Sequence, residues 1–206
     1  AIATKTMAKT PEDFWDDLHT SLRNLRTDHV DLYQFHCIDR VWELGDGTGM
    51  YECMVEAKRQ GKINHIGVTA HKVGTAFEAV ETGLYETMQF PFNYLSSPRE
   101  TELVSACERK NMGFIAMKGL AGGLLMNADA LMAHMACFPN ALPIWGIQRL
   151  EELETWLSYI EEGQPRMSPE LAAAIEADRA ELAGSFCRGC GYCAPCPQGI
   201  VVNQCA

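Results

Sequence analysis

Five of the nine cysteines in this chain lie within its last twenty residues. Cys187, Cys190 and Cys193 follow one another at intervals of three residues, and Cys196 and Cys205 come after them. Thiolates at this spacing can wrap around one face of an iron–sulfur cube, and the glycines at positions 189 and 191 allow the tight loop that this requires. The segment therefore predicts a [4Fe–4S] cluster whose fourth ligand is either Cys196 or Cys205.

Two other uses of this cysteine segment stay open. Structural zinc usually takes two Cys-x-x-Cys pairs separated by a dozen or more residues, and no such spacer divides the segment. Thiols without a metal, including redox-active ones, are the second alternative. The other cysteines stand singly among apolar neighbours, which favours buried free thiols in a reducing compartment, and we expect a cytoplasmic protein. They are Cys37, Cys53, Cys107 and Cys137.

The charge balance excludes several classes of protein. The 206 residues carry a formal net charge of −10, with 47% apolar residues. Such an acidic chain offers no basic groove for nucleic acid and no attraction to an anionic membrane. No apolar stretch approaches the roughly 18 residues that a membrane span needs, and a secretory signal is missing. We expect a globular protein that is not embedded in a membrane.

Short apolar runs alternate with helical patterns along the chain. Helix starts are marked at Thr10-Pro11 and Ser97-Pro98, where a hydroxyl residue precedes a proline. The pattern predicts strands at residues 1–4, 30–35, 65–68, 88–90, 113–116 and 143–145. It predicts helices at residues 11–25, 50–60, 73–81, 98–111, 128–135, 150–159 and 168–182.

This alternation indicates an α/β fold with parallel strands covered by helices. Periodicity alone does not separate a (β/α)8 barrel from an open doubly wound sheet. Six strands are too few for a complete barrel, and the chain opens directly on a strand at Ala1, so we expect a barrel truncated at its N-terminus. The composition changes after residue 159, which predicts a barrel portion over 1–163 and a second part over 164–206. That second part would be a helix followed by the cysteine segment.

Residues at the predicted strand ends carry a family resemblance. In chain order they resemble the aldo-keto reductase superfamily, and the Cys-Arg-Gly-Cys-Gly-Tyr-Cys tail resembles a ferredoxin-tailed branch of it. The resemblance covers nearly the whole chain. The matching stretches are Ala-Thr-Lys-Thr at 3–6, Asp-Leu-Tyr-Gln-Phe-His at 31–36, Gly-Lys-Ile-Asn-His-Ile-Gly-Val-Thr at 61–69, Gln89 with Pro-Phe-Asn at 91–93, Ile-Ala-Met-Lys at 115–118 and Trp-Gly-Ile-Gln-Arg at 145–149.

The resemblance implies a TIM-type (β/α)8 barrel that binds NADP(H) and transfers a hydride to or from a carbonyl carbon. It assigns Lys5 and His36 to the catalytic set, because both match family residues at strand ends, where barrel enzymes keep their chemistry. In relatives, the catalytic aspartate and tyrosine lie on or after the second strand, upstream of anything in this chain. Neither therefore has a counterpart in the chain.

The same resemblance assigns residues to the cofactor. Thr69 and Gln89 match positions that contact the nicotinamide, although Ala70 replaces a hydrogen-bonding side chain there. The other matches belong to the phosphate end of the dinucleotide. Lys118 and Gly119 match the pyrophosphate loop, and Gly146, Gln148 and Arg149 match the site of the adenosine 2′-phosphate, at a helix start that favours anions.

Two functions therefore remain. The first is an NADP(H)-dependent oxidoreductase that reduces an aldehyde or ketone and carries an attached [4Fe–4S] cluster. The alternative is a non-catalytic electron-transfer or redox-sensing iron–sulfur protein on a degenerate barrel. The expected partners are a small carbonyl substrate and an electron-transfer protein, with neither nucleic acid nor membrane.

Overall fold

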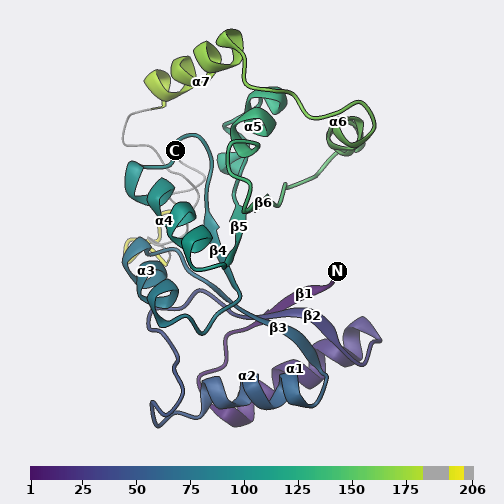
Figure 1. Cartoon of the computed structure of the whole chain (residues 1–206), viewed down its shortest axis with the longest axis vertical. Helices are drawn as coiled ribbons and strands as arrows, with labels where there is room; N and C mark the ends of the chain where they lie inside the picture. Colours follow the sequence, from purple (N-terminus) through teal and green to yellow (C-terminus); the bar gives the residue numbers. More distant parts are fainter. Residues whose placement is uncertain (183–194, 202–206) are drawn as a thin grey trace. The chain divides into compact units, whose positions relative to one another are not determined.

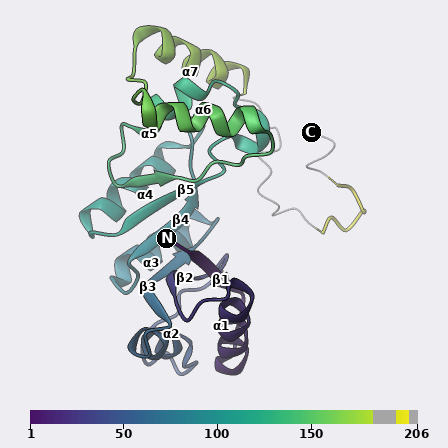
Figure 2. The ribbon, with the colours of Figure 1, turned by 90° about the vertical axis from the view of Figure 1, so that its right-hand side faces the viewer.

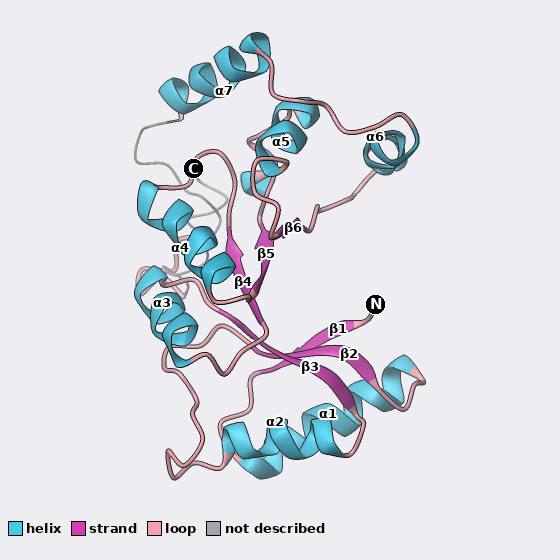
Figure 3. Cartoon of the chain, in the orientation of Figure 1, coloured by secondary structure: helices cyan, strands magenta, loops and turns pink. Residues whose placement is uncertain are grey.

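The computed structural model describes residues 1–182 and 195–201. Six strands are hydrogen-bonded in the order β1-β2-β3-β4-β5-β6, so each strand pairs with the next one in the chain. Figure 3 shows these strands alternating with helices. The strands are β1 (Ala3–Thr6), β2 (Val30–Phe35), β3 (Ile63–Thr69), β4 (Thr87–Pro91), β5 (Gly113–Met117) and β6 (Ala141–Pro143). The α-helices are α1 (Pro11–Leu25), α2 (Met50–Arg59), α3 (Val73–Thr82), α4 (Pro98–Arg109), α5 (Ala128–Met135), α6 (Leu150–Glu161) and α7 (Pro169–Glu181).

The chain divides into two compact units. Unit one comprises residues Ala1–Phe90 and Arg99–Ile115, and unit two comprises Pro91–Pro98 and Ala116–Ala206. The parallel pairs β1–β2, β2–β3 and β3–β4 belong to unit one. The predicted division at residue 163 stays a prediction.

In unit one, α1 and α2 cover the same face of β1–β3 (Figures 1 and 2). Thr10 caps α1 by accepting a hydrogen bond from the Asp13 N–H, and Pro11 occupies the first helical position. Phe14 is fully buried, and its ring lies 5.6 Å from that of Tyr33 and 6.3 Å from that of Phe35, both on β2. Packing between aromatic rings therefore holds α1 against β2.

Unit two has its own apolar cluster, in which α7 packs against α5. Ile175 of α7 is buried with Leu131 and Tyr94, and Leu171 and Leu182 lie partly buried beside them. The Tyr94 hydroxyl donates a hydrogen bond to the Asp178 carboxylate, and Arg179 Nε donates to the Tyr94 carbonyl oxygen over 2.7 Å. Apolar side chains along α7 thus fix this helix in the cluster of unit two.

All predicted strands and helices agree with the structure to within two residues at each end; β1 is shifted by two residues from its predicted range, and so is β6. It covers Ala141–Pro143 instead of residues 143–145. Trp145 lies outside the strand, and its ring stacks on that of Trp156 with the two centroids 4.3 Å apart. Within α1, Phe14, Leu18 and Leu22 are buried, whereas Leu25 at its end is 44% exposed. No helix within the described ranges is long and apolar enough to cross a membrane.

Candidate functional site

Strand register places four predicted site residues on one face of unit one. Lys5 pairs with Gln34, and His36 follows Gln34 by two residues, so all three side chains lie on the same side of the pleat. Gln34 pairs with Gly67, and Thr69, two residues beyond Gly67, pairs with Gln89 of β4. This register gathers four residues at the carboxyl ends of β1–β4, on the face turned away from α1. They are Lys5, His36, Thr69 and Gln89.

The positive charge of Lys5 affects the titration of His36. The His36 backbone N–H donates to the Thr6 carbonyl oxygen over 2.8 Å, which continues the β1–β2 ladder beyond its last paired residues. Partial burial, together with the positive charge of Lys5, holds the pKa of His36 below its ordinary value. His36 is therefore a neutral imidazole near pH 7, with one ring N–H to donate.

Thr69 is buried and held firmly. Its hydroxyl oxygen accepts a hydrogen bond from the Cys37 N–H over 2.6 Å, and its carbonyl oxygen accepts one from the Ile38 N–H over 2.9 Å. The Ala70 N–H donates to the carbonyl oxygen of Gln89, which is also buried. The hydroxyl of Thr69 keeps its own hydrogen for a further acceptor.

Two of the four isolated cysteines differ from expectation. Cys53 and Cys107 are buried as predicted, whereas Cys37 and Cys137 are exposed. Cys37 leaves the end of β2 in the left-handed backbone region, with φ at 52°, and its Sγ lies 3.4 Å from Nδ1 of His71. Apolar neighbours in the sequence do not bury a residue that turns away from its strand.

No tyrosine in the described part of the chain takes the place of the upstream family tyrosine. The Tyr33 ring packs against Phe14, on the face opposite His36. The other described tyrosine hydroxyls bond elsewhere: Tyr51 to the Leu84 carbonyl, Tyr85 to the Trp42 carbonyl, Tyr94 to Asp178 and Tyr159 to Asp129. Within this part of the chain, Lys5 and His36 stand without a tyrosine acid beside them.

Unit two brings together the predicted residues of the phosphate end. A cavity of about 430 Å³ is lined by four of them, Lys118, Gly119, Gly146 and Gln148. Arg149 lines a second cavity of about 330 Å³, which shares Leu120, Gly123 and Glu152 with the first. The second cavity also has apolar walls, supplied by Leu125, Met126 and Trp156 among others.

The loop after β5 is built for close approach. Lys118 adopts the left-handed region with φ at 57°, and the Asn93 side-chain amide donates to its carbonyl oxygen over 3.0 Å. A Cβ atom on Gly119 would lie 2.4 Å from the Trp145 ring. That ring stacks on Trp156, so glycine is required for the loop to close over the tryptophan pair.

We expect Gly119→Ala to force the Trp145 ring away from Trp156. Overpacking of this kind costs about 1–3 kcal/mol of the free energy of unfolding. Urea denaturation measures the loss, and tryptophan fluorescence reports the broken stack. Gly146→Ala is the matched control, because its Cβ would meet nothing within 4 Å. Equal stability of the two variants would contradict this account of the loop.

Glu152 is a site residue that the sequence interpretation missed. Its carboxylate accepts hydrogen bonds from the Gln148 N–H (2.7 Å), the Arg149 N–H (3.2 Å) and Arg149 Nε (3.0 Å). These bonds, that from Gln148 foremost, hold the pKa of Glu152 below its ordinary value. A glutamate three residues after a helix cap is the signal that could have found it.

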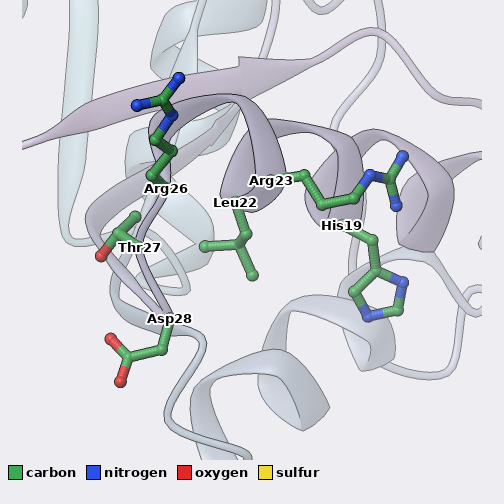
Figure 4. Close-up of a pocket in the computed structure, with 6 residues that line it drawn as sticks. All are labelled: His19, Leu22, Arg23, Arg26, Thr27 and Asp28. Atoms are coloured by element: carbon green, nitrogen blue, oxygen red, sulfur yellow. The ribbon is translucent and has the colours of Figure 1, made fainter.

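A cavity of unit one lies away from these residues. It has a volume of about 820 Å³ and is lined by the last turns of α1 and the turn that follows (Figure 4). It opens beside the start of β2, at the end of the strand opposite His36. Barrel enzymes keep their chemistry at the other end of the strands, so we assign this hollow no catalytic role.

Four of the five predicted cluster cysteines lie outside the described residues: Cys187, Cys190, Cys193 and Cys205. Cys196 is described and is a half-buried free thiol. Within residues 1–182 and 195–201, no three potential metal ligands come together.

Comparison with known proteins gives one family. The model of the aldo/keto reductase family matches residues 1–163. An uncharacterised oxidoreductase of Bacillus subtilis is 36% identical over 115 residues, which are 52% of this chain and 34% of that protein. An uncharacterised oxidoreductase of Schizosaccharomyces pombe is 27% identical over 122 residues, or 59% of this chain and 39% of that one. The chain thus spans little more than a third of the length of these relatives.

Solved structures show the same fold. The thermostable aldo-keto reductase Tm1743, in complex with the inhibitor epalrestat, superimposes with a TM-score of 0.67 at 21% identity, over 85% of this chain and 69% of that one. The aldo-keto reductase AKR11C1 from Bacillus halodurans, in its apo form, gives 0.67 at 18% identity, over 85% and 70%. The six strands of this chain therefore correspond to part of a (β/α)8 barrel.

Proposed function

Because this chain belongs to the aldo/keto reductase family, we propose that it carries part of the active site of an NAD(P)H-dependent reductase of aldehydes or ketones. One observation supports this proposal above the others. Lys5, His36, Thr69 and Gln89 occupy one face at the carboxyl ends of four successive strands. A scaffold without catalysis would not need a cationic and a hydrogen-bonding residue gathered there.

The roles of Lys5 and His36 follow from the charge that develops in the reaction. When a carbonyl carbon accepts a hydride, its oxygen becomes an alkoxide that needs a hydrogen-bond donor and nearby positive charge. The neutral His36 imidazole would donate its N–H to that oxygen and fix the orientation of the carbonyl. Lys5 would supply positive charge and lower the pKa of a tyrosine acid of the kind that the family uses.

The residues of unit two fit the phosphate end of a dinucleotide. Lys118 brings positive charge to the first cavity, and Gly119 and Gly146 let backbone approach a ligand closely. The apolar second cavity suits an adenine ring. When bound, the nicotinamide supplies the hydride.

The proposal is tested by titrating the full chain with NADH and NADPH under anaerobic conditions. We expect nicotinamide fluorescence to change on binding, and Lys118→Ala to weaken the affinity by about tenfold, as loss of a charge-assisted contact does. Lys110→Ala is the control for altered net charge, because it removes the same positive charge from an exposed position just after α4 that lines neither cavity. Absence of binding to both nucleotides would refute the proposal.

We also propose that Cys187, Cys190 and Cys193 bind a [4Fe–4S] cluster, with Cys196 or Cys205 as the fourth ligand. The support is the three-residue spacing alone. Anaerobically purified protein should contain about four irons and four sulfides per chain if the assignment holds. Stoichiometric zinc without sulfide would refute it. Cys196→Ser and Cys205→Ser, compared for iron retention, identify the fourth ligand.

A further inference from the structure

Cys37 and His71 form a thiol–imidazole pair at the carboxyl ends of β2 and β3. The Sγ atom of Cys37 lies 3.4 Å from Nδ1 of His71, and Cys37 is exposed. The position of Cys37 is fixed by its backbone, because its N–H donates to Thr69 Oγ1 over 2.6 Å. A nucleophile and a base thus meet at a place that small solutes can reach.

The surroundings of this pair favour a thiolate. His71 can accept the thiol proton, and the resulting imidazolium holds the negative sulfur by its charge. The next residue, Lys72, is the N-cap of α3, and its side chain makes no capping hydrogen bond. A lysine charge and the N–H groups of a helix start therefore follow His71 directly, and both stabilise a nearby thiolate.

The three other cysteines of residues 1–182 have different surroundings. Cys53 and Cys107 are buried, and burial raises the pKa of both thiols. Cys137 is exposed like Cys37, but its Sγ donates to the carbonyl oxygen of Ala133 over 3.4 Å. A carbonyl oxygen accepts this hydrogen bond without removing the proton, so Cys137 provides a natural comparison for Cys37.

We propose that Cys37, with His71 as its base, is a thiol-exchange site for low-molecular-weight disulfides. His71 takes the thiol proton, and the Cys37 thiolate attacks one sulfur of the disulfide R–S–S–R. A Cys37–S–S–R bond forms as the original S–S bond breaks, and the leaving R–S⁻ takes the proton from the imidazolium to become R–SH. Cys37 is oxidised and one R–S group is reduced, so the disulfide itself is the oxidant. Excess thiol reverses the exchange.

The adduct would stand beside the candidate catalytic residues. Cys37 follows His36 directly, and its N–H is bonded to Thr69. The added R–S group therefore brings bulk to the strand ends where the carbonyl substrate is expected. We expect the adduct to lower kcat/KM for carbonyl reduction and dithiothreitol to restore it. This consequence rests on the proposed function, whereas the exchange at Cys37 does not.

The test follows the reaction of the full chain with oxidised glutathione at each cysteine separately. Trypsin places Cys37 in residues 27–40 and Cys137 in residues 119–149, with no second cysteine in either peptide. Mass spectrometry of the two peptides should show Cys37 reacting about three- to tenfold faster than Cys137. His71→Gln should remove this advantage. His65→Gln is the matched control, because it changes an exposed histidine of β3 whose ring bonds Glu86.

The outcomes separate this inference from the reductase proposal. Equal rates at Cys37 and Cys137 in the unmodified chain would refute the exchange site, and this comparison needs no variant. Equal rates at Cys37 in His71→Gln and His65→Gln would refute the role of His71 as the base. Complete modification of Cys37 with unchanged kcat/KM would refute the block at the strand ends. A chain that reduces no carbonyl before treatment would contradict the reductase proposal, whereas the rates at Cys37 still decide the exchange site.

Discussion

Replacing His36 with alanine is expected to lower kcat for carbonyl reduction by about 10²–10³-fold, the usual cost of losing a donor to a developing oxyanion. The affinity for the dinucleotide should stay within about threefold, because the lost contact is made in the transition state. Steady-state kinetics with a small aldehyde, together with nucleotide titration, measure both quantities.

The control for this variant is His65→Ala. His65 is exposed near the start of β3, where its ring bonds Glu86, far along the strand from the carboxyl end. The substitution His65→Ala thus removes a histidine side chain from the same unit without changing the carboxyl ends of the strands. Equal kcat values for the two variants would remove His36 from the mechanism.

The protonation state of His36 should also be visible in the pH dependence of kcat. Burial and Lys5 lower its pKa, so the neutral donor persists below pH 6.5, the ordinary midpoint for histidine. The loss of kcat on acidification that His36 causes should therefore have its midpoint below pH 6.5. Lys5→Met should move this midpoint to higher pH, because it removes a positive charge that lowers the pKa of His36. A kcat that rises as the imidazole becomes protonated would show that the charged form is the donor.

The second large effect is expected at Gly67, where β2, β3 and β4 approach closely. A Cβ atom on Gly67 would lie 2.2 Å from Thr87 Oγ1 and 3.0 Å from Gln34 Cγ and Leu32 Cδ1. Threonine is branched and stiff, so the strands themselves must move. We expect Gly67→Ala to cost about 1–3 kcal/mol of the free energy of unfolding, and Gly67→Val to cost more.

A double-mutant cycle tests the cause of that loss. Thr87→Ala removes the closest atom, so the double variant Gly67→Ala/Thr87→Ala should be more stable than the sum of the single losses predicts. Gly74→Ala is the control: it lies in α3 with open space around its Cβ and should stabilise by about 0.5–1 kcal/mol. Strict additivity in the cycle would show that Thr87 is not the obstacle.

Local signals in the sequence predicted the fold where they were strong. Thr10 and Pro11 mark the start of α1, and its predicted range agrees with the structure at both ends. β2, in which four of the six residues are apolar, was also predicted with its observed bounds. The last strand was predicted two residues too late, because Trp145 is an apolar residue next to β6. In the structure its ring stacks on Trp156, a tertiary contact that the sequence does not reveal.

The candidate site was predicted in part for similar reasons. Lys5, His36, Thr69 and Gln89 were found through motifs at strand ends, and the register places them on one face because paired residues in parallel strands share a side. Glu152 was missed because the residue at the helix cap, Arg149, is not one of the usual capping residues, so the glutamate three positions later was not recognised. The exposure of Cys37 likewise follows from a backbone turn that its neighbours do not reveal.

The seating of α7 has a consequence for anyone who shortens this protein. The family match ends at residue 163, which makes that position an inviting place to cut. A chain ending there would lose Ile175 from the cluster around Leu131 and would leave the hydroxyl and carbonyl of Tyr94 without Asp178 and Arg179. The truncated protein would expose an apolar surface and would be prone to aggregate. A shortened chain that keeps the family match should therefore also include residues 164–182.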